Sequence, residues 1–158
     1  MNVVAVMPGS FDPYTLGHHD ILVRAAELFG TVIVAVGVNA GKTALLGVDE
    51  RVGMVRAAVA GLPGVTVAAM PGLLVDFCRE QGATVVVRGA RSGSDFDAEW
   101  AMAAMNESLG GIATVVLPAR PEVAFISSTL VRSIVRAGGD VSAYVPASVR
   151  AGLGKENS

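Results

Sequence analysis

The chain has 158 residues, with 12 Lys and Arg against 14 Asp and Glu and a formal net charge of −2. This length predicts one domain spanning residues 1–158, which can bury a sufficient core without disulfides or structural metals. The charge balance argues against a nucleic-acid-binding protein, and the single cysteine, Cys78, excludes an intrachain disulfide or a multi-cysteine zinc site.

Apolar runs alternate with amphipathic stretches along the chain. In chain order the sequence predicts a strand over 3–7, a helix over 17–29, a strand over 32–38, a loop over 39–47, a helix over 49–61, a strand over 65–69, a helix over 73–81, a strand over 84–88, a helix over 95–109, a strand over 113–117, a helix from Ser127 or Ser128 to Ala137, and a short helix from Pro146. Strands alternating with helices predict an α/β fold with a parallel sheet. We expect a single Rossmann-like, doubly wound, five-stranded sheet in the order 3-2-1-4-5.

The turn after the first strand is the most informative stretch. It reads Pro-Gly-Ser-Phe-Asp-Pro-Tyr-Thr-Leu-Gly-His over residues 8–18. Gly9 allows a ligand to approach the backbone, and Ser10 offers a hydroxyl and an N–H. His18 lies in the first turn of the next helix, where free amide groups attract anions. A nucleotide site is therefore expected here.

Two further segments carry groups that suit phosphate, one after the fourth strand and one at the start of the 127–137 helix. The first is Arg88-Gly89-Ala90-Arg91, and the second contains the hydroxyls of Ser127, Ser128 and Thr129. With strand order 3-2-1-4-5, the turns after the first and fourth strands meet at the topological switch point. The acidic residues Asp95, Asp97 and Glu99 follow, and their spacing predicts a solvated helix face rather than a shared metal site.

The Thr15-Leu16-Gly17-His18 element resembles the T/H-x-G-H signature of the nucleotidyltransferase superfamily. Over residues 4 to about 146, length and motif spacing resemble the phosphopantetheine adenylyltransferases, which join ATP to 4′-phosphopantetheine to give 3′-dephospho-coenzyme A and pyrophosphate. The resemblance implies that the residues contacting ATP are Gly9, Ser10, Phe11, His18, Gly89, Ala90, Arg91, Glu99, Val123, Ala124, Phe125, Ile126, Ser127, Ser128 and Thr129. It implies that the residues contacting phosphopantetheine are Ser10, Lys42, Leu74, Arg88, Met105 and Asn106.

The resemblance also implies catalytic roles for His18, Lys42 and Arg91. His18 would donate to the α-phosphate, Lys42 would orient the acceptor phosphate, and Arg91 would bind the β- and γ-phosphates. Mg²⁺ would share the phosphate charge, coenzyme A is a candidate inhibitor, and the assembly would be a homohexamer. Two departures from the family pattern stand out: Thr129 occupies a position where serine is usual, and the loop around Lys42 lacks a proline and a second lysine.

Other function classes fit parts of the sequence. Residues 126–132 also resemble the late motif of nicotinate mononucleotide adenylyltransferases. A non-catalytic ATP-binding regulatory module would need the glycines and helix starts but not His18, Lys42 or Arg88. Residues 37–43 resemble a P-loop that is one residue short of the Walker A spacing.

The N-terminus lacks a signal-peptide pattern, and Pro and Gly interrupt the uncharged stretch over 57–75. No membrane span is therefore expected. A single cysteine fits a reducing compartment, so a cytoplasmic location is expected.

Overall fold

The computed structural model describes residues 2–41 and 43–154, and within them five parallel strands form one sheet. The strands are β1 (Val4–Gly9), β2 (Thr31–Gly37), β3 (Val65–Met70), β4 (Val85–Ala90) and β5 (Ala113–Pro118). The helices are α1 (Leu16–Phe29), α2 (Val48–Val59), α3 (Leu74–Glu80), α4 (Gly93–Gly110), α5 (Ser128–Arg136) and α6 (Ala147–Leu153). The sheet order is β3-β2-β1-β4-β5, which confirms the predicted order.

Strand β1 lies at the centre of the sheet, between β2 and β4. Its Val6 is in register with Ile33 on one side and Val86 on the other. Successive side chains of a strand point to opposite faces: Ala5 and Met7 share a core with residues of α1, α2, α5 and α6, whereas Val6 shares a core with residues of α3. Helices cover both faces, which explains why the central strands are apolar throughout rather than alternating.

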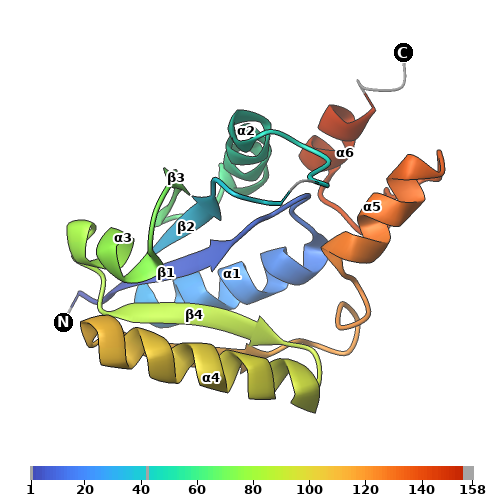
Figure 1. Cartoon of the computed structure of the whole chain (residues 1–158). Coiled ribbons are helices and arrows are strands. Elements are labelled where there is room, and N and C mark those ends of the chain that lie inside the picture. The colour runs from blue at the N-terminus through green and yellow to red at the C-terminus, as the bar shows by residue number, and fades with distance from the viewer. Residues whose placement is uncertain (1, 42, 155–158) are drawn as a thin grey trace.

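Several elements extend beyond the predicted bounds at the edge where the strands end. Strand β1 continues to Gly9 and β4 continues to Ala90, so the glycines predicted as turn residues lie at the ends of strands. Helix α4 begins at Gly93 rather than near Asp95, because the Ser92 side chain accepts a hydrogen bond from the Asp95 N–H and caps the helix. Figure 1 shows α4 running alongside β4, and α5 beyond the arrowheads of β1 and β4.

Helix α4 exposes most of its apolar residues. An apolar stripe on a helix normally faces the core, and Asn106 is the one buried residue of α4 in the described structure. The exposed large side chains on this helix are Phe96, Trp100, Met102, Met105 and Leu109. Among the helices that the structure describes, none is both long and apolar enough to span a membrane.

Candidate active site

A cavity of about 380 Å³ opens at the carboxyl ends of β1 and β4. Its walls come from the turn after β1, the first turn of α1, the end of β4, the first half of α4 and the start of α5. In an open α/β sheet this crevice, where the strand order reverses, is where ligands bind. The structure therefore brings the three predicted phosphate-binding segments to one cavity.

The turn after β1 is held by hydrogen bonds to its carbonyl oxygens. Arg132 donates to the carbonyl of Asp12 over 2.8 Å, and the Ser128 hydroxyl donates to that of Pro13 over 2.8 Å. Phe11 has a φ of 51°, a left-handed conformation that costs a bulky residue roughly 1–2 kcal/mol. These hydrogen bonds from α5 stabilise a turn that its own sequence does not favour.

His18 is fixed by a reciprocal cap at the start of α1. The Thr15 hydroxyl accepts from the His18 N–H over 3.4 Å, and the Thr15 N–H donates to Nδ1 of His18 over 3.0 Å. The imidazole packs edge-on against Phe11 and is stacked with Tyr14, with ring centroids 5.0 and 5.6 Å apart. Because Nδ1 accepts a hydrogen bond, the proton of the neutral ring is on Nε2, which is thereby a donor.

The electrostatic surroundings keep this ring neutral. Burial, followed by the nearby positive charges of Arg88 and Arg91, lowers the pKa of His18 to about 4. At neutral pH the site therefore offers an uncharged N–H donor rather than an imidazolium.

Arg88 is preorganised by an acidic partner on α4. Its Nε and Nη2 donate to the two carboxylate oxygens of Glu99, each over 2.8 Å, and its Nη1 donates to the carbonyl of Pro8 over 2.8 Å. A two-point contact of this kind fixes both position and orientation of a guanidinium. Arg88 lines the cavity and joins the end of β1 to β4 and α4.

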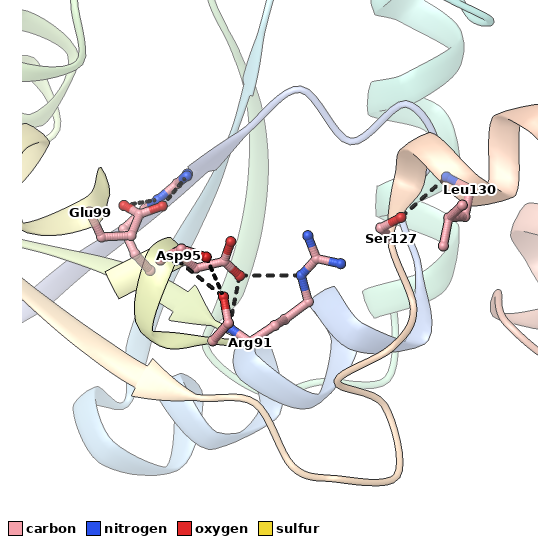
Figure 2. A network of polar contacts seen from close by, with 8 residues as sticks. Arg91, Asp95, Glu99, Ser127 and Leu130 are labelled. Carbon is pink, nitrogen blue, oxygen red and sulfur yellow. Dashed lines mark hydrogen bonds and ion pairs between the residues drawn. The ribbon is translucent and has the colours of Figure 1, made fainter. Parts of the chain in front are cut away.

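Arg91 crosses toward the start of α5. The backbone N–H of Arg91 donates to the Asp95 carboxylate over 2.9 Å, and Nε of its guanidinium lies 3.4 Å from the same carboxylate. Figure 2 shows the Arg91 guanidinium directed toward the side of the site that carries Ser127. Ser127 caps α5 by accepting from the Leu130 N–H over 3.2 Å. A guanidinium and the N-terminus of a helix, which carries amide groups lacking intrahelical acceptors, form an anion-binding pair.

Comparisons with known proteins place the chain among the enzymes that this geometry suggests. The cytidylyltransferase-like family model matches residues 6–134. A phosphopantetheine adenylyltransferase of Cutibacterium acnes is 52% identical over 149 residues, covering 94% of this chain and 95% of the relative. A phosphopantetheine adenylyltransferase of Methylococcus capsulatus is 50% identical over 154 residues, covering 97% and 95%. The chain belongs to the phosphopantetheine adenylyltransferase family.

A solved structure with the same fold lies further away in sequence. A Vibrio parahaemolyticus protein, provisionally assigned as a nicotinate-nucleotide adenylyltransferase, superposes with a TM-score of 0.74 at 21% identity, covering 99% of this chain and 94% of that one. At this identity the likeness shows that the two chains share a fold, and it shows nothing about the substrate.

Most residues predicted to contact ATP line the cavity. These are Gly9, Ser10, Phe11, His18, Gly89, Arg91, Glu99, Val123, Ile126, Ser127, Ser128 and Thr129. Three others are not part of the cavity wall: Ala90, Ala124 and Phe125. Phe125 is 62% exposed, and its ring packs edge-on against Tyr144.

The residues predicted to contact phosphopantetheine are divided. Ser10 and Arg88 line the cavity, but Leu74, Met105 and Asn106 do not. Leu74 begins α3, and the other two lie in the second half of α4, where Met105 is exposed and Asn106 is buried. Lys42 lies outside the described residues.

The three hydroxyls at the start of α5 have partners within the protein. Ser127 caps the helix, Ser128 donates to Pro13, and Thr129 accepts from the Arg132 guanidinium over 3.2 Å. The Ser128 proton is therefore used to hold the turn. The anion-binding capacity of this segment rests more on its backbone amides than on the hydroxyls that the sequence suggested.

Three residues of the site were not predicted from the sequence to belong to it. Asp12 accepts from the Leu45 and Leu46 N–H groups, Asp95 lies in the cavity wall rather than on a solvated face, and Arg132 lines the cavity from α5. Arg132 lies one helical turn after Ser128, so spacing on a helix could have placed it on the same side. Nothing in the sequence indicates the long-range contact of Asp12.

A resident magnesium ion would need free oxygen ligands in the cavity wall. No cluster of three or more His, Cys, Asp or Glu residues suited to a metal occurs among residues 2–41 and 43–154. The carboxylates in the cavity wall, those of Asp12, Asp95 and Glu99, are already paired with N–H groups or a guanidinium. In this member of the phosphopantetheine adenylyltransferase family the described carboxylates therefore do not form a binding site for a resident Mg²⁺ ion.

Proposed function

We propose that the chain transfers the adenylyl group of ATP to 4′-phosphopantetheine, giving 3′-dephospho-coenzyme A and pyrophosphate, within coenzyme A biosynthesis. One observation carries this proposal: His18, both arginines of the 88–91 segment and the N-terminus of α5 line a single cavity. Relatives at about half identity over nearly the whole chain supply the acceptor, and they favour it over nicotinate mononucleotide or a non-catalytic ATP-binding role.

The reaction needs placement rather than a general base. An oxygen of the acceptor phosphate attacks the α-phosphorus of ATP, and the bond from that phosphorus to the oxygen bridging to the β-phosphate breaks. The electron pair leaves with pyrophosphate. The attacking oxygen is ionised at neutral pH, so catalysis consists of alignment and stabilisation of charge on the phosphoryl oxygens.

His18 is the donor to the α-phosphate. Its Nε2–H is available because Nδ1 is held by Thr15. The edge-on contact with Phe11 and the stacking with Tyr14 fix the ring plane. A neutral donor stabilises growing charge in the transition state without adding a fixed cation to the ground state.

The remaining groups divide between the two substrates. Ser10 and Arg88, with Lys42 from the β2–α2 loop, hold the acceptor phosphate. Arg91 and the amides at the start of α5 hold the β- and γ-phosphates, so the leaving pyrophosphate is bound as it forms. Arg132 adds positive charge on the same side.

Mg²⁺ enters as the ATP complex, as part of the substrate. Magnesium in such reactions is held largely by phosphate oxygens and water, with few protein ligands. This arrangement suits a cavity whose carboxylates are already engaged. Removing Mg²⁺ with a chelator is expected to abolish turnover and to leave the melting temperature of the ligand-free protein unchanged.

A homohexamer is proposed as the assembly, with the exposed face of α4 as one of its contacts. Trp100 is 66% exposed and lies about one helical turn after Phe96, which is also exposed. Exposed apolar patches of this kind mark association surfaces. We expect Trp100→Asp to reduce the mass measured by sedimentation, whereas Leu28→Asp, at an equally exposed leucine of α1, leaves it unchanged. A wild-type monomer would contradict this assembly.

The proposed location is the cytoplasm, and coenzyme A is the proposed inhibitor. Coenzyme A carries the whole skeleton of the product plus one phosphate, so it can compete for the product's subsites. Inhibition that is relieved by raising the phosphopantetheine concentration would support this proposal.

The deciding experiment measures pyrophosphate release from ATP by the purified protein. Release that requires 4′-phosphopantetheine supports the proposed reaction. Release with nicotinate mononucleotide instead would assign the sibling activity, and ATP binding without release from either acceptor would indicate a non-catalytic module.

A further inference from the structure

Arg51 of α2 is buried although it is a charged side chain. It is only 2% exposed and does not line the cavity. Its side chain donates four hydrogen bonds, all to backbone carbonyls: to Ser10 over 2.7 Å, to Gly37 over 2.7 Å, to Val38 over 3.1 Å and to Leu46 over 3.2 Å. One guanidinium therefore joins the turn after β1 to both ends of the loop between β2 and α2.

Of the residues that Arg51 bonds, Ser10 lines the cavity, whereas Gly37, Val38 and Leu46 lie outside its wall. Ser10 is in the turn after β1, residues 37 and 38 are at the exit of β2, and Leu46 ends the loop that leads into α2. Asp12 holds the same loop from the turn, accepting from the Leu45 N–H over 2.8 Å and the Leu46 N–H over 2.9 Å. Both ends of residues 38–46 are thereby fixed relative to Ser10.

Burying a charge without a counter-ion is costly. Within the described part of the chain, no carboxylate forms an ion pair with Arg51. Four carbonyl acceptors offset this cost only because the planar fork of arginine can reach several of them at once. The turn that Arg51 bonds also contains Phe11 in a left-handed conformation. This combination indicates that Arg51 serves to hold the backbone of the turn in a defined geometry.

The contact with Ser10 has a direct consequence for the turn. In a trans peptide the carbonyl oxygen and the following N–H point in opposite directions. Holding the Ser10 carbonyl against Arg51 therefore aims the Phe11 N–H away from Arg51. Both Ser10 and Phe11 line the cavity.

We propose that Arg51 is a positioning residue for the acceptor phosphate, which sets the Ser10 turn and the β2–α2 loop at the correct separation without touching substrate. This inference rests on the proposed adenylyl transfer and adds a residue that controls the affinity for one of its two substrates. Arg91 and the start of α5, placed around the β- and γ-phosphates, are not among the described hydrogen-bond partners of Arg51.

The test compares Arg51→Lys and Arg51→Met with the wild type. Lysine keeps the charge and the stem but presents a single ammonium, which cannot bond the turn and both ends of the loop at once. Both variants are expected to raise the KM and the calorimetric Kd for phosphopantetheine by about tenfold or more, an effect equivalent to one lost charged hydrogen bond. The KM and Kd for ATP are expected to stay within about threefold of the wild type.

Arg56→Lys is the matched control. Arg56 is on the same helix, and its guanidinium donates to the carbonyl of Val67 in β3 over 3.2 Å, away from the cavity. Both KM values are expected to be unchanged in this variant. If Arg51→Met does not fold, Arg51→Gln, which retains two N–H donors, takes its place.

The outcomes separate this inference from the proposed function. A wild type without adenylyl transfer to phosphopantetheine overturns the proposed function. If the wild type is active, variants with a lower kcat but normal KM and Kd for both substrates show a purely structural role and overturn the inference. Equal losses of affinity for ATP and phosphopantetheine, or full rescue by lysine, overturn it as well.

Discussion

The backbone N–H of Thr15 decides which nitrogen of His18 holds the proton. It donates to Nδ1 over 3.0 Å, so the neutral ring presents Nε2–H on its other side. The same contact belongs to the cap of α1, in which the Thr15 hydroxyl accepts from the His18 N–H. The hydrogen bonds that cap α1 therefore also orient His18, the proposed donor to the α-phosphate.

His18 is expected to stay uncharged throughout the physiological range. Its folded pKa of about 4 lies below the value near 6.5 expected for an unfolded chain. As the pH falls from about 6.5 toward 4, the unfolded state takes up the proton first, so the stability contributed by neutral His18 is lost over that window. NMR titration can follow this directly, because the chain contains two histidines and His19→Asn identifies the remaining signal. A His18 signal that titrates near pH 6.5 would contradict the burial of the ring.

Replacing the imidazole should affect turnover far more than ATP affinity. We expect His18→Ala to lower kcat by about 10²–10³, the usual cost of one transition-state donor, and to change the calorimetric Kd for ATP by less than about threefold. His19→Ala is the neighbouring control, since His19 bonds the Tyr14 hydroxyl over 3.1 Å and does not line the cavity. Similar turnover in the two variants would remove His18 from the mechanism.

The Arg88–Glu99 pair should be coupled energetically. Arg88→Met, Glu99→Gln and the double variant form a cycle whose coupling in urea unfolding is expected to be about 1 kcal/mol, a modest value because the Arg88 side chain is 35% exposed. The Arg79–Asp76 pair, more than half exposed on both sides, is the control, and its coupling should be near zero. Equal coupling in the two cycles would show that the two-point contact adds nothing.

Gly89 leaves room for α1, and a methyl group there should be costly. A Cβ at this position would lie 2.9 Å from Cγ1 of Ile21, a buried residue of α1. Gly89→Ala is therefore expected to lower the free energy of unfolding by about 1–3 kcal/mol. Gly93→Ala, at the start of α4 with no atom within 4 Å of its Cβ, should leave stability unchanged or slightly raised. Denaturant unfolding of both variants checks the difference, and equal stabilities would contradict the tight fit.

The sequence predicted the sheet and the location of the cavity well because these depend on local patterns. Continuous apolar runs such as the one around Val6 indicate a strand covered on both faces. The motif over residues 8–18 indicates at which edge of the sheet a ligand binds. The pattern on α4 was less informative, because periodicity gives the apolar stripe but not what covers it. Phe96 and Trp100, four residues apart, lie on one face of the helix and are nevertheless exposed.

The contacts that hold the site together could not be predicted. Arg51 and Ser10 are 41 residues apart, and Arg132 and Asp12 are 120 residues apart. Each contact joins a side chain to a backbone carbonyl. The sequence therefore contains no oppositely charged partner residue that would indicate the contact. Residue types alone also suggested that the hydroxyls of Ser127 and Ser128 were free for phosphate, whereas both serve local structure.

The exposed indole of α4 provides a fluorescence probe of the assembly of this protein. The chain contains one tryptophan, Trp100, which follows Glu99 directly and is 66% exposed. Its fluorescence has a single source, so a shift of the emission maximum to shorter wavelength on concentration would report that this helix face has left water. No dye or engineered label is needed to follow assembly.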